Sequence, residues 1–171
     1  MILETLTLIA GALNHPTYGV AAKYATIPTA SLTVRVVPPV VIASELTHAQ
    51  LATDAYEGPF PALLVMQSDD VQLIPHNASG ARDSDFTAVI SYRGSIMPQD
   101  VGVSSGLLTM KAVQRCIESL FADVNEPDRG LNGVYLWDYH RMTQSPMLHN
   151  PDDNKQSCTL KIEMMVRDTV L

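Results

Sequence analysis

The segment Gln156-Ser-Cys-Thr-Leu-Lys-Ile-Glu-Met-Met-Val-Arg167 alternates between two kinds of residue. Its even positions are apolar, and they are Cys158, Leu160, Ile162, Met164 and Val166. The odd positions include Thr159, Lys161, Glu163 and Arg167. Because successive side chains of a strand point to opposite faces, this period of two predicts a long strand with one face in the core.

The residues before this segment predict a partner strand at Val134–Met142. A polar loop, roughly Thr143–Gln156, separates the two strands, so we expect them to pair antiparallel. Further upstream, an amphipathic helix is predicted from Ser105 or Gly106 to Val124. Its apolar stripe recurs every three or four residues, as a core-facing helix requires, and consists of Met110, Val113, Ile117, Leu120 and Val124.

The first half of the chain gives weaker signals. Two helices are predicted, at residues 2–13 and from Ser44 to about Tyr56, and four strands, at residues 32–37, 62–67, 71–74 and 86–92. The run at 62–67 is continuously apolar, which is typical of a strand covered on both faces. Turn-forming residues dominate 14–31 and 75–84, which are predicted to be extended loops, like 143–156.

Together these elements predict one domain over residues 1–171. The expected fold class is α+β: a mostly antiparallel sheet of four or five strands packed against two or three helices in a two-layer sandwich.

The charge of the chain disfavours some classes of function and favours others. Charged residues make up 17% of the 171 residues, with 11 Lys and Arg against 18 Asp and Glu, for a formal net charge of −7. Sequence-reading nucleic-acid binding needs clustered Lys and Arg, so it is disfavoured. Interface cores are depleted in charge, and a sparsely charged chain therefore favours an assembly subunit.

The cysteines and the N-terminus bear on cellular location. Cys116 and Cys158 are too few and too far apart for a disulfide framework and are predicted to be small buried hydrophobes. The apolar N-terminus carries Glu4 where a signal peptide has positive charge, and it is too short to span a bilayer. Export and membrane insertion are therefore not expected.

Catalytic motifs give no assignment. The chain contains no Walker A sequence, Gly-x-Gly-x-x-Gly, nucleophile elbow or paired metal-ligand spacing, so no catalytic residue, metal or cofactor is predicted. A small cytoplasmic metal-dependent enzyme using Asp138, His140 and His149 is retained as an alternative. Polar loops commonly carry such residues because they are solvated, so the spacing alone does not favour it.

Aromatic residues and arginine are concentrated in the predicted strand at Val134–Met142. A regular strand would place four of them on one face, and they are Tyr135, Trp137, Tyr139 and Arg141. Trp, Tyr and Arg are enriched at interface hot spots, but aromatic residues also fill cores. The sequence leaves both interpretations open.

The order of these elements resembles a known family. It runs from the N-terminal helix through Pro61-Ala-Leu-Leu-Val-Met-Gln67, Asp85-Phe-Thr-Ala-Val-Ile-Ser-Tyr92 and the Leu107–Val124 helix to the Trp/Tyr strand and the final strand. This order is similar to that of tail-terminator proteins of tailed bacteriophages, also called tail-completion or head–tail joining proteins. The likeness is one of architecture and spans most of the chain.

The resemblance implies a structural virion protein of the neck or tail that assembles in the host cytoplasm. It implies a homo-oligomeric ring, a hexamer in that family, that caps the tail tube protein and meets the head-completion or connector protein. DNA would pass through its lumen without sequence-specific binding. Another neck or tail-tube component, or an adaptor domain whose edge strand recruits a peptide, are the remaining alternatives.

Overall fold

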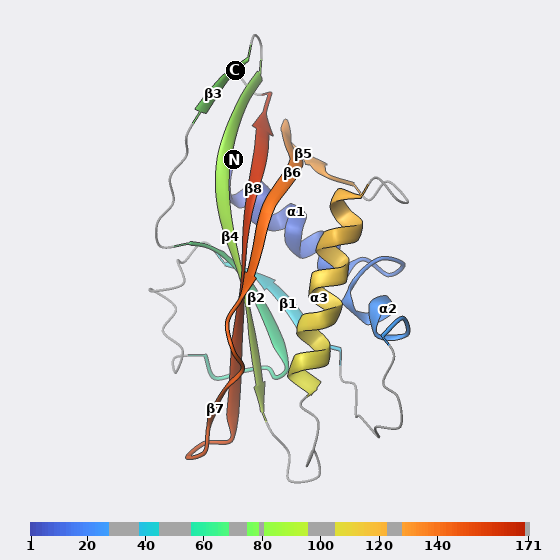
Figure 1. Cartoon of the computed structure of the whole chain (residues 1–171), viewed down its shortest axis with the longest axis vertical. Coiled ribbons are helices and arrows are strands. Elements are labelled where there is room, and N and C mark those ends of the chain that lie inside the picture. Colours follow the sequence, from blue (N-terminus) through green and yellow to red (C-terminus); the bar gives the residue numbers. More distant parts are fainter. Residues whose placement is uncertain are drawn as a thin grey trace.

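The computed structural model describes residues 1–27, 38–44, 56–68, 75–78, 81–95, 105–122 and 128–169 (Figure 1). The helices in this part of the chain are α1 (Ile2–Asn14), α2 (Val20–Tyr24) and α3 (Ser105–Phe121). The strands are β1 (Val40–Ala43), β2 (Ala62–Gln67), β3 (Pro75–Ala78), β4 (Ala81–Ser95), β5 (Gly130–Leu131), β6 (Val134–Gln144), β7 (Leu148–Asn150) and β8 (Lys155–Asp168).

All eight strands join one mixed sheet. Its order is β1-β2-β4-β8-β6-β5, with β3 paired to β4 and β7 paired to β8 at their ends. β1 runs parallel to β2, and every other pairing is antiparallel. The predicted sheet of four or five strands was therefore wrong, because short strands form at residues predicted to be loop and β1 adds a parallel edge.

The long strands β4 and β8 organise the sheet. They pair without a break from Arg82 opposite Asp168 to Ser95 opposite Lys155. The hairpin that β3 forms with β4 and the hairpin that β7 forms with β8 lie at opposite ends of these strands (Figure 1). The predicted final strand and its antiparallel pairing with the preceding strand are confirmed.

The main core lies between the sheet and the helices, which cover the same face (Figure 1). All five apolar even positions of β8 are buried there, as the alternation predicts. α3 contributes Met110, Val113, Ile117 and Leu120, which confirms four positions of its predicted stripe. α1 adds Leu6, Ile9 and Leu13 from its own predicted face.

A smaller core lies on the other face of the sheet. It consists of Ala62, Leu64 and Met66 of β2 and Val89 of β4, while Leu63 and Val65 point into the main core. Residues 62–66 of β2 are therefore buried on both faces, which confirms the interpretation of its continuous apolar run.

Residues 14–31 were predicted to be irregular, but α2 forms within them and docks on α3. The Tyr24 hydroxyl lies 2.8 Å from the hydroxyl of Thr109, and the Lys23 ammonium donates to the Ser119 hydroxyl, also at 2.8 Å. Burial raises the pKa of Tyr24 to about 12, so its hydroxyl stays protonated at neutral pH. Tertiary contacts thus order a segment whose composition alone indicated a loop.

Two other loop predictions were also wrong. Residues 75–78 form β3 and residues 81–84 begin β4, paired from Pro75 opposite Ser84 to Ala78 opposite Ala81. Within 143–156, β7 pairs with the start of β8, and the turn between them covers residues 151–154. The strands predicted at 32–37 and 71–74 lie outside the described residues, as do residues 45–55 of the helix predicted after Ser44.

The close packing of the chain between α1 and α2 predicts how glycine substitutions there change the stability of the protein. A side-chain carbon at Gly19 would collide with the main-chain carbonyl oxygens of Leu13 and His15, whereas one at Gly11 meets nothing within 4 Å. We expect Gly19→Ala to lower the free energy of unfolding by about 1–3 kcal/mol. Gly11→Ala, in mid-helix, is expected to raise it by up to about 1 kcal/mol.

Urea unfolding of both variants beside the parent protein measures these two free energies. Equal effects of the two substitutions would contradict the described path of the chain between α1 and α2.

Candidate functional site

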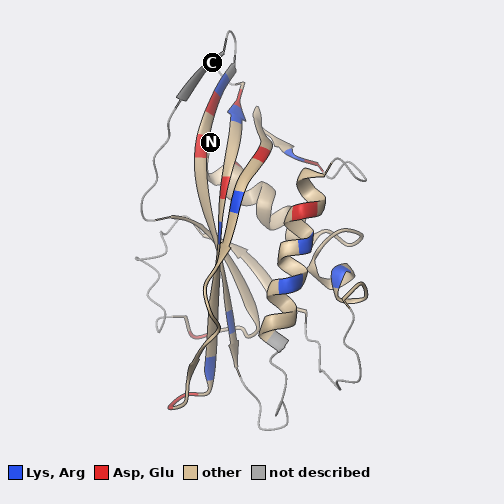
Figure 2. Cartoon of the chain, viewed as in Figure 1, with Lys and Arg blue, Asp and Glu red and all other residues tan. Residues whose placement is uncertain are grey.

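The face of the sheet opposite the helices carries cross-strand ion pairs on β4, β8 and β6. Arg167 donates two hydrogen bonds to the Asp83 carboxylate, at 2.7 and 3.0 Å, and Arg141 Nε donates to Glu163 at 3.1 Å. Both signs of charge are interspersed along these strands (Figure 2). We call this side the outer face.

The pair between Asp83 and Arg167 also positions an aromatic residue. The Arg167 guanidinium lies 3.9 Å from the centroid of the Trp137 ring, and Trp137 packs edge-on against Tyr135 at 6.4 Å. Arg129 lies over the Tyr135 ring at 5.1 Å. We define Arg129, Tyr135, Trp137 and Arg167 as the Trp137 patch.

The Trp137 patch is both exposed and held in place. Trp137 is 47% exposed, an unusual state for the largest apolar side chain. The bidentate hydrogen bonds to Asp83 fix the guanidinium that stacks on it and raise the pKa of Arg167, which therefore stays charged. An aromatic side chain held in this way loses little conformational freedom on binding, which favours tight contacts.

The predicted face of four residues is only partly present. Irregularities in the pairing with β8 fall between Leu136 and Asp138 and between Tyr139 and Arg141. They turn Tyr139 to the helix side, where it contacts Phe121 at 5.2 Å between ring centroids. Tyr135, Trp137 and Arg141 remain on the outer face, but Arg141 pairs with Glu163, away from the patch.

The residues of the enzymatic alternative do not converge. His140 lies 3.4 Å from the Asp85 carboxylate, while the Asp138 carboxylate accepts a hydrogen bond from the main-chain N–H of Tyr139. His149 pairs opposite Gln156, about seven β8 residues or roughly 23 Å from His140. Among the described residues, no group of three or more His, Cys, Asp or Glu is placed to hold a metal ion.

Both cysteines are free and buried, as predicted. Burial raises the pKa of the Cys116 thiol to about 12 and also raises the pKa of Cys158, so both are protonated at neutral pH. In the part of the chain that the structure describes, no helix has the length and hydropathy to cross a membrane.

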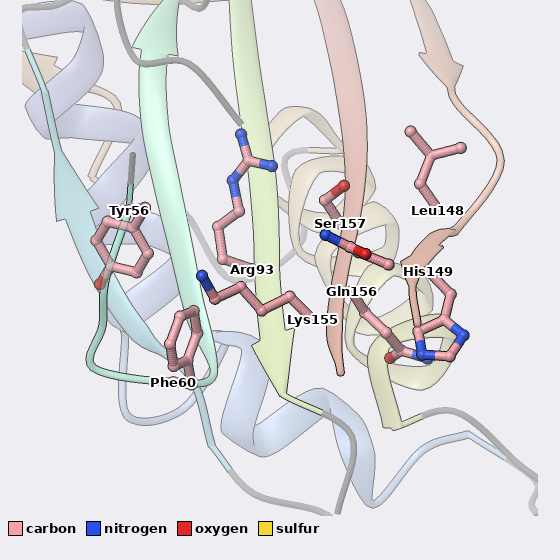
Figure 3. A pocket seen from close by; sticks show the side chains of 9 residues that line it. Tyr56, Phe60, Arg93, Leu148, His149, Lys155, Gln156 and Ser157 are labelled. Carbon is pink, nitrogen blue, oxygen red and sulfur yellow. The ribbon is translucent and has the colours of Figure 1, made fainter. Parts of the chain in front are cut away.

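A pocket of about 180 Å³ lies at the β7 end of the outer face (Figure 3). Its apolar walls are Tyr56 and Phe60 on one side and Leu148 on the other. Three basic side chains also line it, and they are Arg93 of β4, His149 of β7 and Lys155 of β8. The remaining lining residues are neutral and polar, so the described lining contains no acidic side chain.

Sequence reasoning missed this pocket and half of the Trp137 patch. The pocket lining comes from three parts of the chain that are far apart in sequence, residues 56–60, Arg93 and the β7–β8 hairpin, which the sheet pairing brings together. Arg167 was recognised as an outward residue, but its contact with Trp137 depends on the irregular register of β6. Arg129 follows a segment of turn-forming residues, and no pattern around it indicated a contact with an aromatic side chain.

No protein-family model matches the chain, and no curated protein does. Among solved structures, it is similar to a chain described as "Virion of native gene transfer agent (GTA) particle", with a TM-score of 0.41 and 15% sequence identity. The match covers 86% of this chain and 93% of that chain. A likeness at this level carries no argument about what this chain does.

Proposed function

We propose that this chain is a structural protein of a tailed-phage virion, a subunit of a closed ring that caps the tail tube and joins it to the head connector. The observation that carries the proposal is the Trp137 patch. An exposed tryptophan stacked by an arginine that is itself fixed by two hydrogen bonds has the composition of an interface hot spot.

The sparse charge of the chain supports the same role. Charged residues are 17% of the sequence, and four of those on the outer face neutralise one another in two pairs, Arg141 with Glu163 and Arg167 with Asp83. Paired charges lower the cost of placing this face near a neighbouring subunit, because an isolated charge is expensive to remove from water. The proposed role is mechanical, and it requires no catalytic residue, metal or cofactor.

The order of elements supports the tail-terminator assignment in particular. The longer elements of the described residues occur in the order α1, β2, β4, α3, β6 and β8, with shorter elements between them. This is the order on which the resemblance to tail terminators rests. In the proposed hexameric ring, copies meet head to tail, since a closed ring needs two different complementary surfaces on each subunit. DNA passes through the lumen without base-specific contacts.

Binding to tail tubes tests the role in the virion. The purified protein is mixed with polymerised tail tube protein of the same phage and imaged by negative-stain electron microscopy. We expect density at one end of each tube and shorter tubes when the protein is present during polymerisation. Binding along the sides of tubes, or no binding, would reject the capping role.

A further inference from the structure

The pocket at the β7 end of the outer face combines apolar walls with a basic floor. We propose that it binds an acidic side chain, glutamate or aspartate, carried on an apolar segment of a partner protein. This inference does not depend on ring formation, because all the described lining residues belong to a single chain.

The aromatic wall is held in position before any ligand binds. Tyr56 and Phe60 pack edge to face at 5.6 Å between ring centroids, and the Tyr56 hydroxyl donates to the main-chain carbonyl of Pro59 at 3.0 Å. Figure 3 shows the two rings on the far side of Arg93 and Lys155 from Leu148 and His149. A bound side chain would therefore have apolar surface on both sides and cations between them.

The charge of the pocket selects an anion. Arg93 is 4% exposed and already interacts with another group of the chain, but its guanidinium has five N–H donors and is well suited to bind a carboxylate. The Lys155 ammonium contacts Asp153 at 3.1 Å, and it has three N–H donors, so donors remain for a ligand. Arg93 and Lys155 thus place two cationic side chains in the lining of one pocket, in a chain whose net charge is −7.

The size and edges of the pocket favour a side chain on a protein segment. A volume of about 180 Å³ is below the ~300–1,000 Å³ of typical small-molecule sites. Leu148 is 58% exposed, the highest value among the exposed large hydrophobic residues of the described chain. Its apolar surface beside the opening is available to the residues that flank the bound acid.

The experiment titrates the full-length ¹⁵N-labelled protein with the peptide acetyl-Leu-Glu-Leu-amide and follows amide chemical shifts. We expect saturable shifts of Phe60, Lys155 and Ser157 at millimolar peptide. Acetyl-Leu-Gln-Leu-amide should bind about tenfold more weakly, because a hydrogen bond to a charged group is worth more than one to a neutral group. Equal binding of the two peptides would overturn the proposal, and so would the absence of shifts at the pocket.

Two lysine variants distinguish binding in the pocket from a general effect of the protein's charge on peptide binding. Lys155→Gln should weaken binding of the glutamate peptide about fivefold to tenfold, whereas Lys161→Gln, an exposed lysine further along the same strand, should leave it unchanged. Equal effects of the two variants would contradict a specific site. Sodium benzoate is the third ligand, and binding as tight as that of the peptide would reject a protein segment as the occupant.

Discussion

Trp137→Ala is expected to weaken self-association of the protein about 30-fold or more. Hot-spot aromatic residues contribute about 2 kcal/mol or more to binding, and each 1.4 kcal/mol is a factor of ten. Trp137 has the features of such a residue: it is large, half exposed, and positioned by Arg167. The association constant is measured by sedimentation equilibrium over a range of protein concentrations.

Leu107→Ala provides the matched control. Leu107 is 49% exposed on α3, so it presents a similar fraction of apolar surface from the opposite side of the sheet. The control is expected to leave association unchanged, and both variants should keep a cooperative thermal transition. If both substitutions weaken association equally, the contact is non-specific and the Trp137 patch is not the interface.

Phe86→Ala is expected to lower the free energy of unfolding by about 3–5 kcal/mol, the usual cost of removing a buried phenylalanine ring. Phe86 lies on β4 opposite Met164 of β8, is 1% exposed, and faces the helices. Because this is a large part of the stability of a typical domain, the variant should unfold at a much lower urea concentration.

The neighbouring Thr87→Ala is the control for this second prediction. Thr87 points to the outer face and is only partly buried, so its substitution should cost less than about 1 kcal/mol. A cost below about 1 kcal/mol for Phe86→Ala would contradict the placement of the main core between β4 and the helices.

The elements with the clearest periods were predictable from the sequence. In β8 and α3, the apolar positions that repeat regularly face one core, so a period of two or of three to four residues maps directly onto burial. β2 was predictable for a different reason. Its continuous apolar run serves a core on each side of the sheet.

Other features depend on contacts that no local pattern encodes. The alternation in β6 is interrupted near Trp137 and His140, so counting by twos placed Tyr139 on the wrong face. Arg93 lies on the outer face of β4, and its charge gives no local sign that it is only 4% exposed. The short strands β3 and β7 consist largely of residues that favour turns, and their pairing with β4 and β8 overrides that preference.

The mass of the native assembly in solution tests most directly whether the chain acts by binding copies of itself. Native mass spectrometry or sedimentation velocity measures it at micromolar concentration. The proposed hexamer predicts one closed species of about 112 kDa, six copies of the 18.6 kDa chain, that Trp137→Ala dissociates. A particle of 18.6 kDa at every concentration tested would contradict the account.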